Sequence, residues 1–256
     1  MTEAPVMQSI QNRCFRFTCH RRMPCFNRCC GNLNLVLTPY DILRLKKRLR
    51  LSSGQCLDRY TDGQIDKASG LPLVRLRMGG RASRHCPFVQ AEGCTVYEDR
   101  PGACRLYPLA RAALRFFGPG NVSERYFLVK EPHCLGLKAE RQWTVDGWLA
   151  DQGMVEYNVK NDAFAAVFSC RPRQVLRGLT DRHRQMMFTA CYDLDGFRDF
   201  VFNSTFLERF AVEDDRLMRI ETDDAPLLDF AMQWLRFALF GETTLPAADG
   251  FAPPRR

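Results

Sequence analysis

Residues 19–30 read CHRRMPCFNRCC, a run of four cysteines with the gaps Cys-x5-Cys-x3-Cys-Cys. A second set, between residues 86 and 134, has the gaps Cys-x7-Cys-x9-Cys-x29-Cys. Thiolates are strong ligands for zinc and iron, so eight of them in one small region predict metal sites that help to hold it folded. The candidate ligands are Cys19, Cys25, Cys29, Cys30, Cys86, Cys94, Cys104 and Cys134.

The composition indicates a globular chain in a reducing compartment. Its 256 residues are 46% hydrophobic and 26% charged, and no apolar stretch is long enough to span a membrane. Residues 1–12 lack the apolar core of a secretion signal, so we expect a cytoplasmic protein. Because the cytosol keeps thiols reduced, metal ligation is favoured over disulfides.

The positive charge gathers in the cysteine-rich half. Residues 1–150 hold 24 Lys+Arg against 12 Asp+Glu, in a chain whose net charge is +8. Two divalent ions would offset only part of the charge of eight thiolates, so nearby arginines would be stabilising. Local compensation is therefore favoured over the two alternatives, a generic solvated face and a surface that contacts nucleic acid.

A helix is predicted to begin after Thr38. Thr38 would be the N-cap, Pro39 is tolerated at the first helical position, and Asp41 would complete a capping box. The apolar face would continue to Leu49. The basic residues expected to point largely outward are Arg44, Lys46, Lys47 and Arg48.

Short strands are expected in the first half of the chain. Alternating apolar residues favour a strand over 71–78, and residues 94–97 are a second candidate. The glycine- and proline-containing stretch 118–121 predicts a hairpin between 112–117 and 125–130.

The remainder reads mostly as helix. Residues 139–149 look helical, a boundary is expected near Asp151, and the clearest late helix begins at Asp224 and stops at Gly241. The sequence thus predicts an α+β chain. A small, irregular, metal-stapled cysteine-cluster domain with short strands (13–150) would precede a mainly helical domain (151–250).

The adjacent pair Cys29-Cys30 indicates more than one site. Neighbouring side chains point in different directions, so the pair would serve two ions, or one member would ligate while the other fills a gap in the core. The eight cysteines can supply two four-thiolate sites, or one iron–sulfur cluster with a separate zinc site. The isolated Cys56, Cys170 and Cys191 are expected to be small buried side chains.

Three histidines adjoin candidate ligands: His20, His85 and His133. Each would replace a cysteine or donate a hydrogen bond to one, although a partly exposed histidine near a polar site is the favoured interpretation. Cys14, five residues before Cys19, is a spare candidate ligand.

Two segments carry a family resemblance. The first contains Phe17-Thr18-Cys19, Cys29-Cys30 and Leu37-Thr38-x-x-Asp41-Ile42. The second contains Cys86-Pro87-Phe88 and residues 93–108, which read GCTVYEDRPGACRLYP. Together they resemble the YkgJ-like cysteine-cluster family, also called zinc/iron-chelating proteins, over about residues 15–140. The resemblance implies that the eight cysteines bind zinc or an iron–sulfur centre of 4Fe-4S type. Because the first gap is wider than the family's usual Cys-x2-Cys, Cys14 or His20 stands as an alternative first ligand.

The same domain occurs in the flagellin lysine-N-methylases, which implies a sharper alternative. The chain would then be an iron–sulfur enzyme that uses S-adenosylmethionine to methylate a lysine of a protein substrate. Against it, the C-terminal half shows no motif that matches those enzymes. The leading hypothesis is binding of zinc or an iron–sulfur cluster, with no catalytic residue assigned. A further alternative is a metal-stapled adaptor whose basic half contacts RNA or an acidic partner.

Arg100 and Arg105 are the candidate cofactor-binding residues, because guanidinium groups clamp carboxylates or phosphates bidentately. The favoured alternative is that they pair with Glu98, Asp99 or thiolates and so fix the loop. Tyr97 and Tyr107 are interpreted as packing residues with a hydrogen-bonded hydroxyl rather than as catalytic acids.

Overall fold

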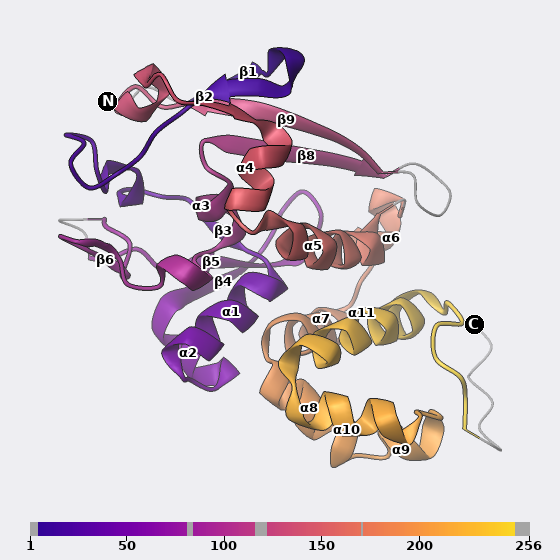
Figure 1. The fold of residues 1–256 in the computed structure, drawn as a ribbon. Coiled ribbons are helices and arrows are strands. Elements are labelled where there is room, and N and C mark those ends of the chain that lie inside the picture. Colours follow the sequence, from indigo (N-terminus) through magenta and orange to yellow (C-terminus); the bar gives the residue numbers. More distant parts are fainter. Residues whose placement is uncertain (1–4, 81–83, 116–121, 170, 249–256) are drawn as a thin grey trace. The chain divides into compact units, whose positions relative to one another are not determined.

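The computed structural model describes residues 5–80, 84–115, 122–169 and 171–248. Its contacts divide the chain into two compact units. We refer to Met1–Val36 with Arg75–Val159 as the cysteine unit, and to Leu37–Val74 with Lys160–Arg256 as the helical unit. The α+β class is confirmed, with short antiparallel strands in the first unit and mainly helices in the second (Figure 1). The domain boundary near residue 150 stays a prediction, and residues 37–74 group with the later helices.

Small antiparallel sheets build the cysteine unit. The strands are β1 (Val6–Ser9), β2 (Cys14–Arg16), β6 (Val89–Gln90), β7 (Gly93–Cys94), β8 (Leu109–Arg115), β9 (Val122–Lys130) and β10 (Gln142–Thr144). They pair in the orders β1-β9-β8, β10-β2 and β6-β7. The predicted hairpin is confirmed as β8 and β9, adjacent in Figure 1 with Leu109 opposite Leu128. Its turn, residues 118–121, lies outside the described residues.

Short helices connect these strands. They are α3 (Gly102–Leu106) and α4 (Val145–Asp151), with the 3-10 turns η1 (Gln11–Arg13), η2 (Arg28–Cys30), η3 (Tyr97–Asp99) and η4 (Leu135–Lys138). The strand expected over 94–97 is confirmed only at Cys94, because Tyr97 already begins η3.

The helix expected over 139–149 is wrong for its first part. Residues 142–144 form β10, in which Trp143 lies opposite Phe15 of β2. Helix α4 begins after Thr144, whose hydroxyl accepts the Gly147 N–H at 3.0 Å. Pairing with a distant strand has therefore overridden the local helical pattern. Trp148 of α4 packs edge-to-face on Phe15 at 5.9 Å between ring centroids and on Trp143 at 5.0 Å, which forms an aromatic core.

Helices dominate the helical unit. They are α1 (Pro39–Leu49), α2 (Ser53–Tyr60), α6 (Arg173–Arg177), α7 (Asp181–Tyr192), α8 (Leu194–Phe202), α9 (Phe206–Arg209), α10 (Asp214–Thr222) and α11 (Asp224–Phe240). A further sheet has the order β3 (Val36–Leu37), β5 (Pro72–Leu76), β4 (Thr61–Ile65), and α5 (Met154–Phe168) precedes α6. The strand predicted over 71–78 is confirmed as β5, with alternate residues buried. Among the described helices, none combines the length and the apolar character needed to cross a membrane.

Capping and a buried stripe define the predicted helices. Thr38 Oγ1 accepts the Asp41 N–H at 3.3 Å, and Asp41 Oδ2 accepts the Thr38 N–H at 2.8 Å, so the capping box is confirmed. Helix α11 has Asp223 as its N-cap and ends at Gly241, whose φ of +67° is left-handed. Its apolar face is buried, with Phe230 fully inaccessible.

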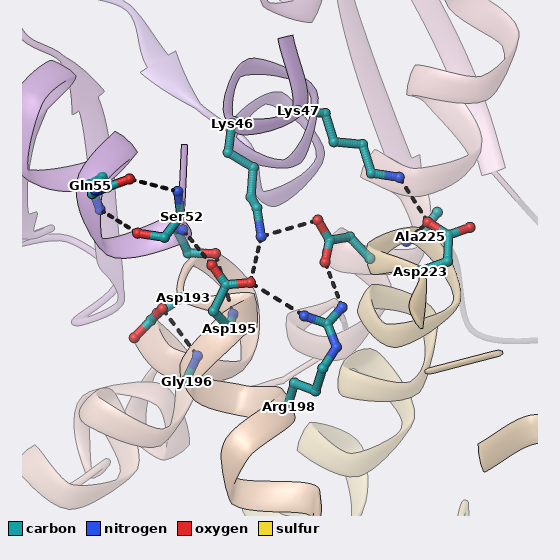
Figure 2. A network of polar contacts seen from close by, with 12 residues as sticks. Lys46, Lys47, Ser52, Gln55, Asp193, Asp195, Gly196, Arg198, Asp223 and Ala225 are labelled. Carbon is teal, nitrogen blue, oxygen red and sulfur yellow. Dashed lines mark hydrogen bonds and ion pairs between the residues drawn. The ribbon is translucent and has the colours of Figure 1, made fainter. Parts of the chain in front are cut away.

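Lys46 departs from the predicted outward basic face of α1. Its side chain is 8% exposed, and its Nζ lies 2.7 Å from Asp195 and 3.1 Å from Asp224 (Figure 2). Arg198 completes the network, 2.6 Å from Asp224. The prediction for Lys46 is therefore wrong, because its partner Asp195 comes from 149 positions later in the chain. Burial of this ammonium is tolerated because the charge is paired.

Candidate metal centre

Consecutive turns shape the cysteine loop between β2 and η2. The Met23 N–H donates to the His20 carbonyl at 3.0 Å, the Phe26 N–H to the Met23 carbonyl at 2.9 Å, and the Arg28 N–H to the Cys25 carbonyl at 3.0 Å. Besides these turns, contacts with later segments hold the loop; for example, Asn27 Nδ2 donates to the Gln90 carbonyl at 2.8 Å.

Another of these segments follows Cys134. Cys25 Sγ accepts the Leu135 N–H at 3.4 Å, and the Thr18 N–H donates to the Gly136 carbonyl at 3.1 Å. Gly136 has no room for a side chain, because a Cβ there would lie 2.5 Å from the Thr18 carbonyl oxygen. These contacts bring Cys134 to the cysteine loop from more than a hundred residues away.

A second set of contacts assembles around Cys30. The Cys86 N–H donates to the Cys30 carbonyl at 2.8 Å. Cys94 follows Cys86 closely because the short β6–β7 pair places Val89 opposite Cys94. Cys104 lies in α3.

Electrostatic interactions link the thiols in two sets, which the Cys29–Cys30 hydrogen bond joins. Burial, and then three neighbouring thiols, raise the pKa of Cys19 to about 11. Those neighbours are Cys29, Cys25 and Cys134. Cys30 instead interacts with Cys86 and Cys104, and Cys86 interacts with Cys94. We refer to Cys19, Cys25, Cys29 and Cys134 as the first group, and to Cys30, Cys86, Cys94 and Cys104 as the second group.

The adjacent Cys29 and Cys30 belong to different groups although their thiols touch. A hydrogen bond from Cys30 lowers the pKa of Cys29, while the same bond, burial and the charge of Cys29 raise the pKa of Cys30. One peptide bond thus joins the two groups. That the pair serves separate ions stays a prediction.

Buried polar atoms surround the first group. Among the described residues, Tyr107 OH, Glu131 Oε2 and His133 Nε2 are buried and make no hydrogen bond of ordinary geometry. Glu131 Oε2 and His133 Nε2 lie 3.3 Å apart, the distance of an ion pair when the imidazole is protonated. Burial, and then the nearby Cys134, raise the pKa of Tyr107. Native proteins rarely leave such atoms unpaired, so a bound ion and its ligands at the first group would account for them.

Glu131 is the residue of this site that the sequence analysis missed. Its carboxylate acts on the pKa of Cys29, which it raises against the larger effect of the Cys30 hydrogen bond. The Cys134 N–H donates to the Glu131 carbonyl at 2.9 Å, so a tight turn fixes the position of Glu131 relative to Cys134. An acidic residue three positions before a candidate ligand was the available signal.

Arg100 and Arg105 are buried and tie the α3 loop together. The Arg100 guanidinium donates to the Tyr97 carbonyl and stacks 3.8 Å from that ring centroid. Arg105 donates to the Gln152 carbonyl at 2.6 Å and to the Glu98 carbonyl. These contacts go to backbone carbonyls and fix the loop beside the second group. A role in cofactor binding stays a prediction.

The remaining candidate residues differ in their exposure. His20 and His85 are exposed, which agrees with the interpretation of exposed histidines. Cys56 and Cys191 are buried, as expected, whereas Cys170 lies outside the described residues. Cys14 lies in β2, opposite Thr144 of β10.

The donor set fits zinc or iron. All the described cysteines are free thiols, which agrees with ligation rather than disulfides. Within the described ranges, no three or more His, Cys, Asp or Glu side chains lie close enough together to hold a metal ion. The chemistry nevertheless matches, because two sets of four thiols are the ligands that zinc and iron–sulfur clusters use. An imidazole and a carboxylate beside the first group add harder donors.

Comparison with known proteins agrees with this donor set. Residues 18–135 match the family CxxCxxCC, described as "Putative zinc- or iron-chelating domain". No curated protein and no solved structure matches the chain. The matched segment contains all eight candidate ligands. Residues 18–135 therefore match the cysteine-cluster family that the sequence motifs resemble, which confirms the predicted likeness over this segment.

Proposed function

We propose that this protein binds metal at two centres, one in each cysteine group. The proposal rests on the eight cysteines of the matched segment and on the backbone contacts that bring Cys134 to the cysteine loop and Cys86 to Cys30. Four thiolates are the usual ligand number of a structural zinc ion and of a 4Fe-4S cluster. Each centre would therefore hold zinc or an iron–sulfur cluster. Zinc would cross-link the loops, and a cluster would in addition be able to carry an electron.

The electrostatics of the thiols support this proposal. Burial raises the pKa of Cys86 and of Cys94, so ionising these thiols is costly without a nearby cation. A bound cation would take the place of the protons, so that metal binding releases protons and holds distant segments together.

Anaerobic purification of the full chain, followed by assays for zinc, iron and acid-labile sulfide, tests the proposal. A brown protein with iron and sulfide in near-equal amounts would identify clusters, and a colourless protein with zinc would identify structural ions. A folded protein that retains no zinc and no iron under these conditions would refute metal binding.

Serine variants sharpen the assignment of ligands. Cys104→Ser in the second group and Cys134→Ser in the first should each release metal. The matched control is Cys191→Ser, because Cys191 is equally a cysteine but lies buried in α7 of the helical unit. Equal metal loss from all three variants would show that the ligands are assigned wrongly.

The resemblance to flagellin lysine-N-methylases supplies the finer alternative, an S-adenosylmethionine-dependent iron–sulfur methyltransferase that acts on protein lysine. Calorimetric titration of cluster-replete protein with S-adenosylmethionine tests it, and absence of binding would remove it. Retention on RNA that weakens as salt rises would instead favour the adaptor with a basic face.

A further inference from the structure

A surface cavity of about 590 Å³ adjoins the first cysteine group. It lies within the cysteine unit, between the end of β1, strand β2, the end of β9 and the segment that leads into η4. Cys134 and Glu131 are among its lining residues. Binding sites for small molecules typically measure roughly 300–1,000 Å³, so this cavity has room for one.

The charged side chains at this cavity are mostly basic. Arg16, Lys130 and Lys138 line it, against the single acid Glu131. Within the described part of the chain, none of these three cations makes an ion pair or a side-chain hydrogen bond. By contrast, Arg13 does not line the cavity and forms an ion pair with Asp146 at 2.7 Å. Three unpaired cations around one cavity create a positive potential that favours an anion.

The remaining wall is partly apolar. The apolar residues that line it are Phe15, Leu128 and Leu137. Packing of Phe15 on Trp148 holds this part of the wall in place. An apolar wall with a few placed charges is typical of a ligand site. Glu131, which lines the cavity, lies 3.3 Å from the His133 imidazole through its Oε2 atom.

We propose that this cavity binds a small anionic molecule through Arg16, Lys130 and Lys138, next to the metal of the first cysteine group. The carboxylate and phosphate groups of metabolites share the recognition chemistry, because both accept charge-assisted hydrogen bonds from Lys and Arg. The proposal depends on the proposed function at one point, the presence of a metal next to the cavity. The anion site itself rests on the cavity and its cations.

Calorimetric titration of the full-length protein as purified, with inorganic phosphate and with succinate as probes, tests the anion site. We expect saturable binding of at least one probe and none of glycerol. Phosphate binding alone would assign a phosphate ligand, and succinate binding alone a carboxylate. The double variant Arg16→Gln/Lys130→Gln should weaken binding by roughly tenfold or more, since two charge-assisted hydrogen bonds are lost.

The matched control is Arg125→Gln. Arg125 is an exposed cation on the same strand, β9, but it does not line the cavity. Unchanged binding in this control supports the proposal. Equal weakening in the control and the double variant, or no saturable binding of either probe, would overturn it.

A second readout separates the anion site from the metal. In protein whose metal has been exchanged for cobalt, anion binding should change the visible absorption of the cobalt–thiolate centre. Anion binding without any spectral change would overturn its placement next to the metal. A protein that takes up no metal would contradict the proposed function, while the titrations would still decide on the anion site.

Discussion

The cysteine unit and the helical unit hold their folds by different means. The helical unit buries whole aromatic side chains such as Phe197 and Phe230, and it pairs its buried Lys46 with two carboxylates. The cysteine unit has short strands, and its eight candidate thiols lie in loops and short elements. The difference teaches that a hydrophobic core holds the helical unit, whereas the cysteine unit has little apolar packing around its thiols, so a bound ion would stabilise it.

Removal of metal should have the largest effect, and it should destabilise the cysteine unit but not the helical unit. Chelation of metal-loaded protein should unfold the cysteine unit, since metal contributes about 10 kcal/mol or more to small zinc-dependent domains. Trp143 and Trp148 report on that unit, and Trp234 on the helical unit. Chelation should therefore red-shift the fluorescence of Trp234→Phe and leave that of the double variant Trp143→Phe/Trp148→Phe unchanged. Equal red shifts in both proteins would contradict the distinction.

Truncation in the aromatic core of α11 should have the next largest effect, in the other unit. Phe230 is fully buried, so Phe230→Ala should cost about 3–5 kcal/mol of unfolding free energy through lost contacts and a cavity. Urea titration followed through Trp234 measures this cost. Metal content per folded molecule should remain unchanged, and a variant that folds but has lost its metal would show that the units depend on each other.

A single methyl group at Gly136 should disturb the first cysteine group. A Cβ there would lie 2.5 Å from the Thr18 carbonyl, so Gly136→Ala forces apart the segments that carry Cys134 and Cys25. The expected cost is about 1–3 kcal/mol, with weaker metal retention during dialysis against a chelator. The matched control is Gly54→Ala in α2, where nothing lies within 4 Å of the added carbon. That variant should be neutral or slightly more stable, since alanine favours a helix. Metal retention equal to that of the unsubstituted protein in Gly136→Ala would disprove the close approach.

Acid should have the smallest effect, and it should act on the helical unit. Partial burial acts to raise the pKa of Asp195, but hydrogen bonds from Lys46 and Ser53 outweigh it and hold that pKa below its usual value. A hydrogen bond from Lys47 likewise lowers the pKa of Asp223. A carboxyl whose folded pKa is lowered stabilises the fold above its unfolded pKa of about 3.9 and loses that contribution as the pH falls through the folded value.

Urea midpoints measured between about pH 6 and pH 2 on the Trp234 signal should therefore fall with the pH. Asp223→Asn should flatten part of this dependence, because the amide does not titrate. Glu221→Gln is a surface control in the same unit, because the Glu221 side chain is exposed, and its substitution should leave the slope unchanged. A midpoint independent of pH would contradict the role of these ion pairs.

Local signals predicted the parts of the fold that depend on local interactions. The capping box at Thr38, the hairpin and the stripe of α11 each rest on residues a few positions apart, and all three are confirmed. Lys46 and β10 were missed because their partners, Asp195 and β2, lie far away in the sequence. A helical pattern does not reveal a partner that appears more than a hundred residues away.

The candidate ligands stay a prediction from the sequence, and their spacing does not indicate which of them lie close together. Sequence spacing places Cys30 with Cys29, and Cys134 with Cys104. The thiol interactions instead place Cys30 with Cys86 and Cys134 with Cys19. These different pairings of Cys30 and Cys134 depend on two backbone hydrogen bonds between distant segments. The Cys86 N–H donates to the Cys30 carbonyl, and the Thr18 N–H donates to the Gly136 carbonyl. Spacing carries no information about such contacts.

The single peptide bond between Cys29 and Cys30 has a thermodynamic consequence. The negative charge of Cys29 hinders ionisation of Cys30. A divalent ion offsets only part of the charge of four thiolates, so filling of the first group would leave net negative charge beside Cys30. Filling of the first group should thus lower the affinity of the second, and by reciprocity the second should lower that of the first. Uptake would then be stepwise, so that half-loaded molecules are abundant at intermediate metal concentrations, as native mass spectrometry would reveal.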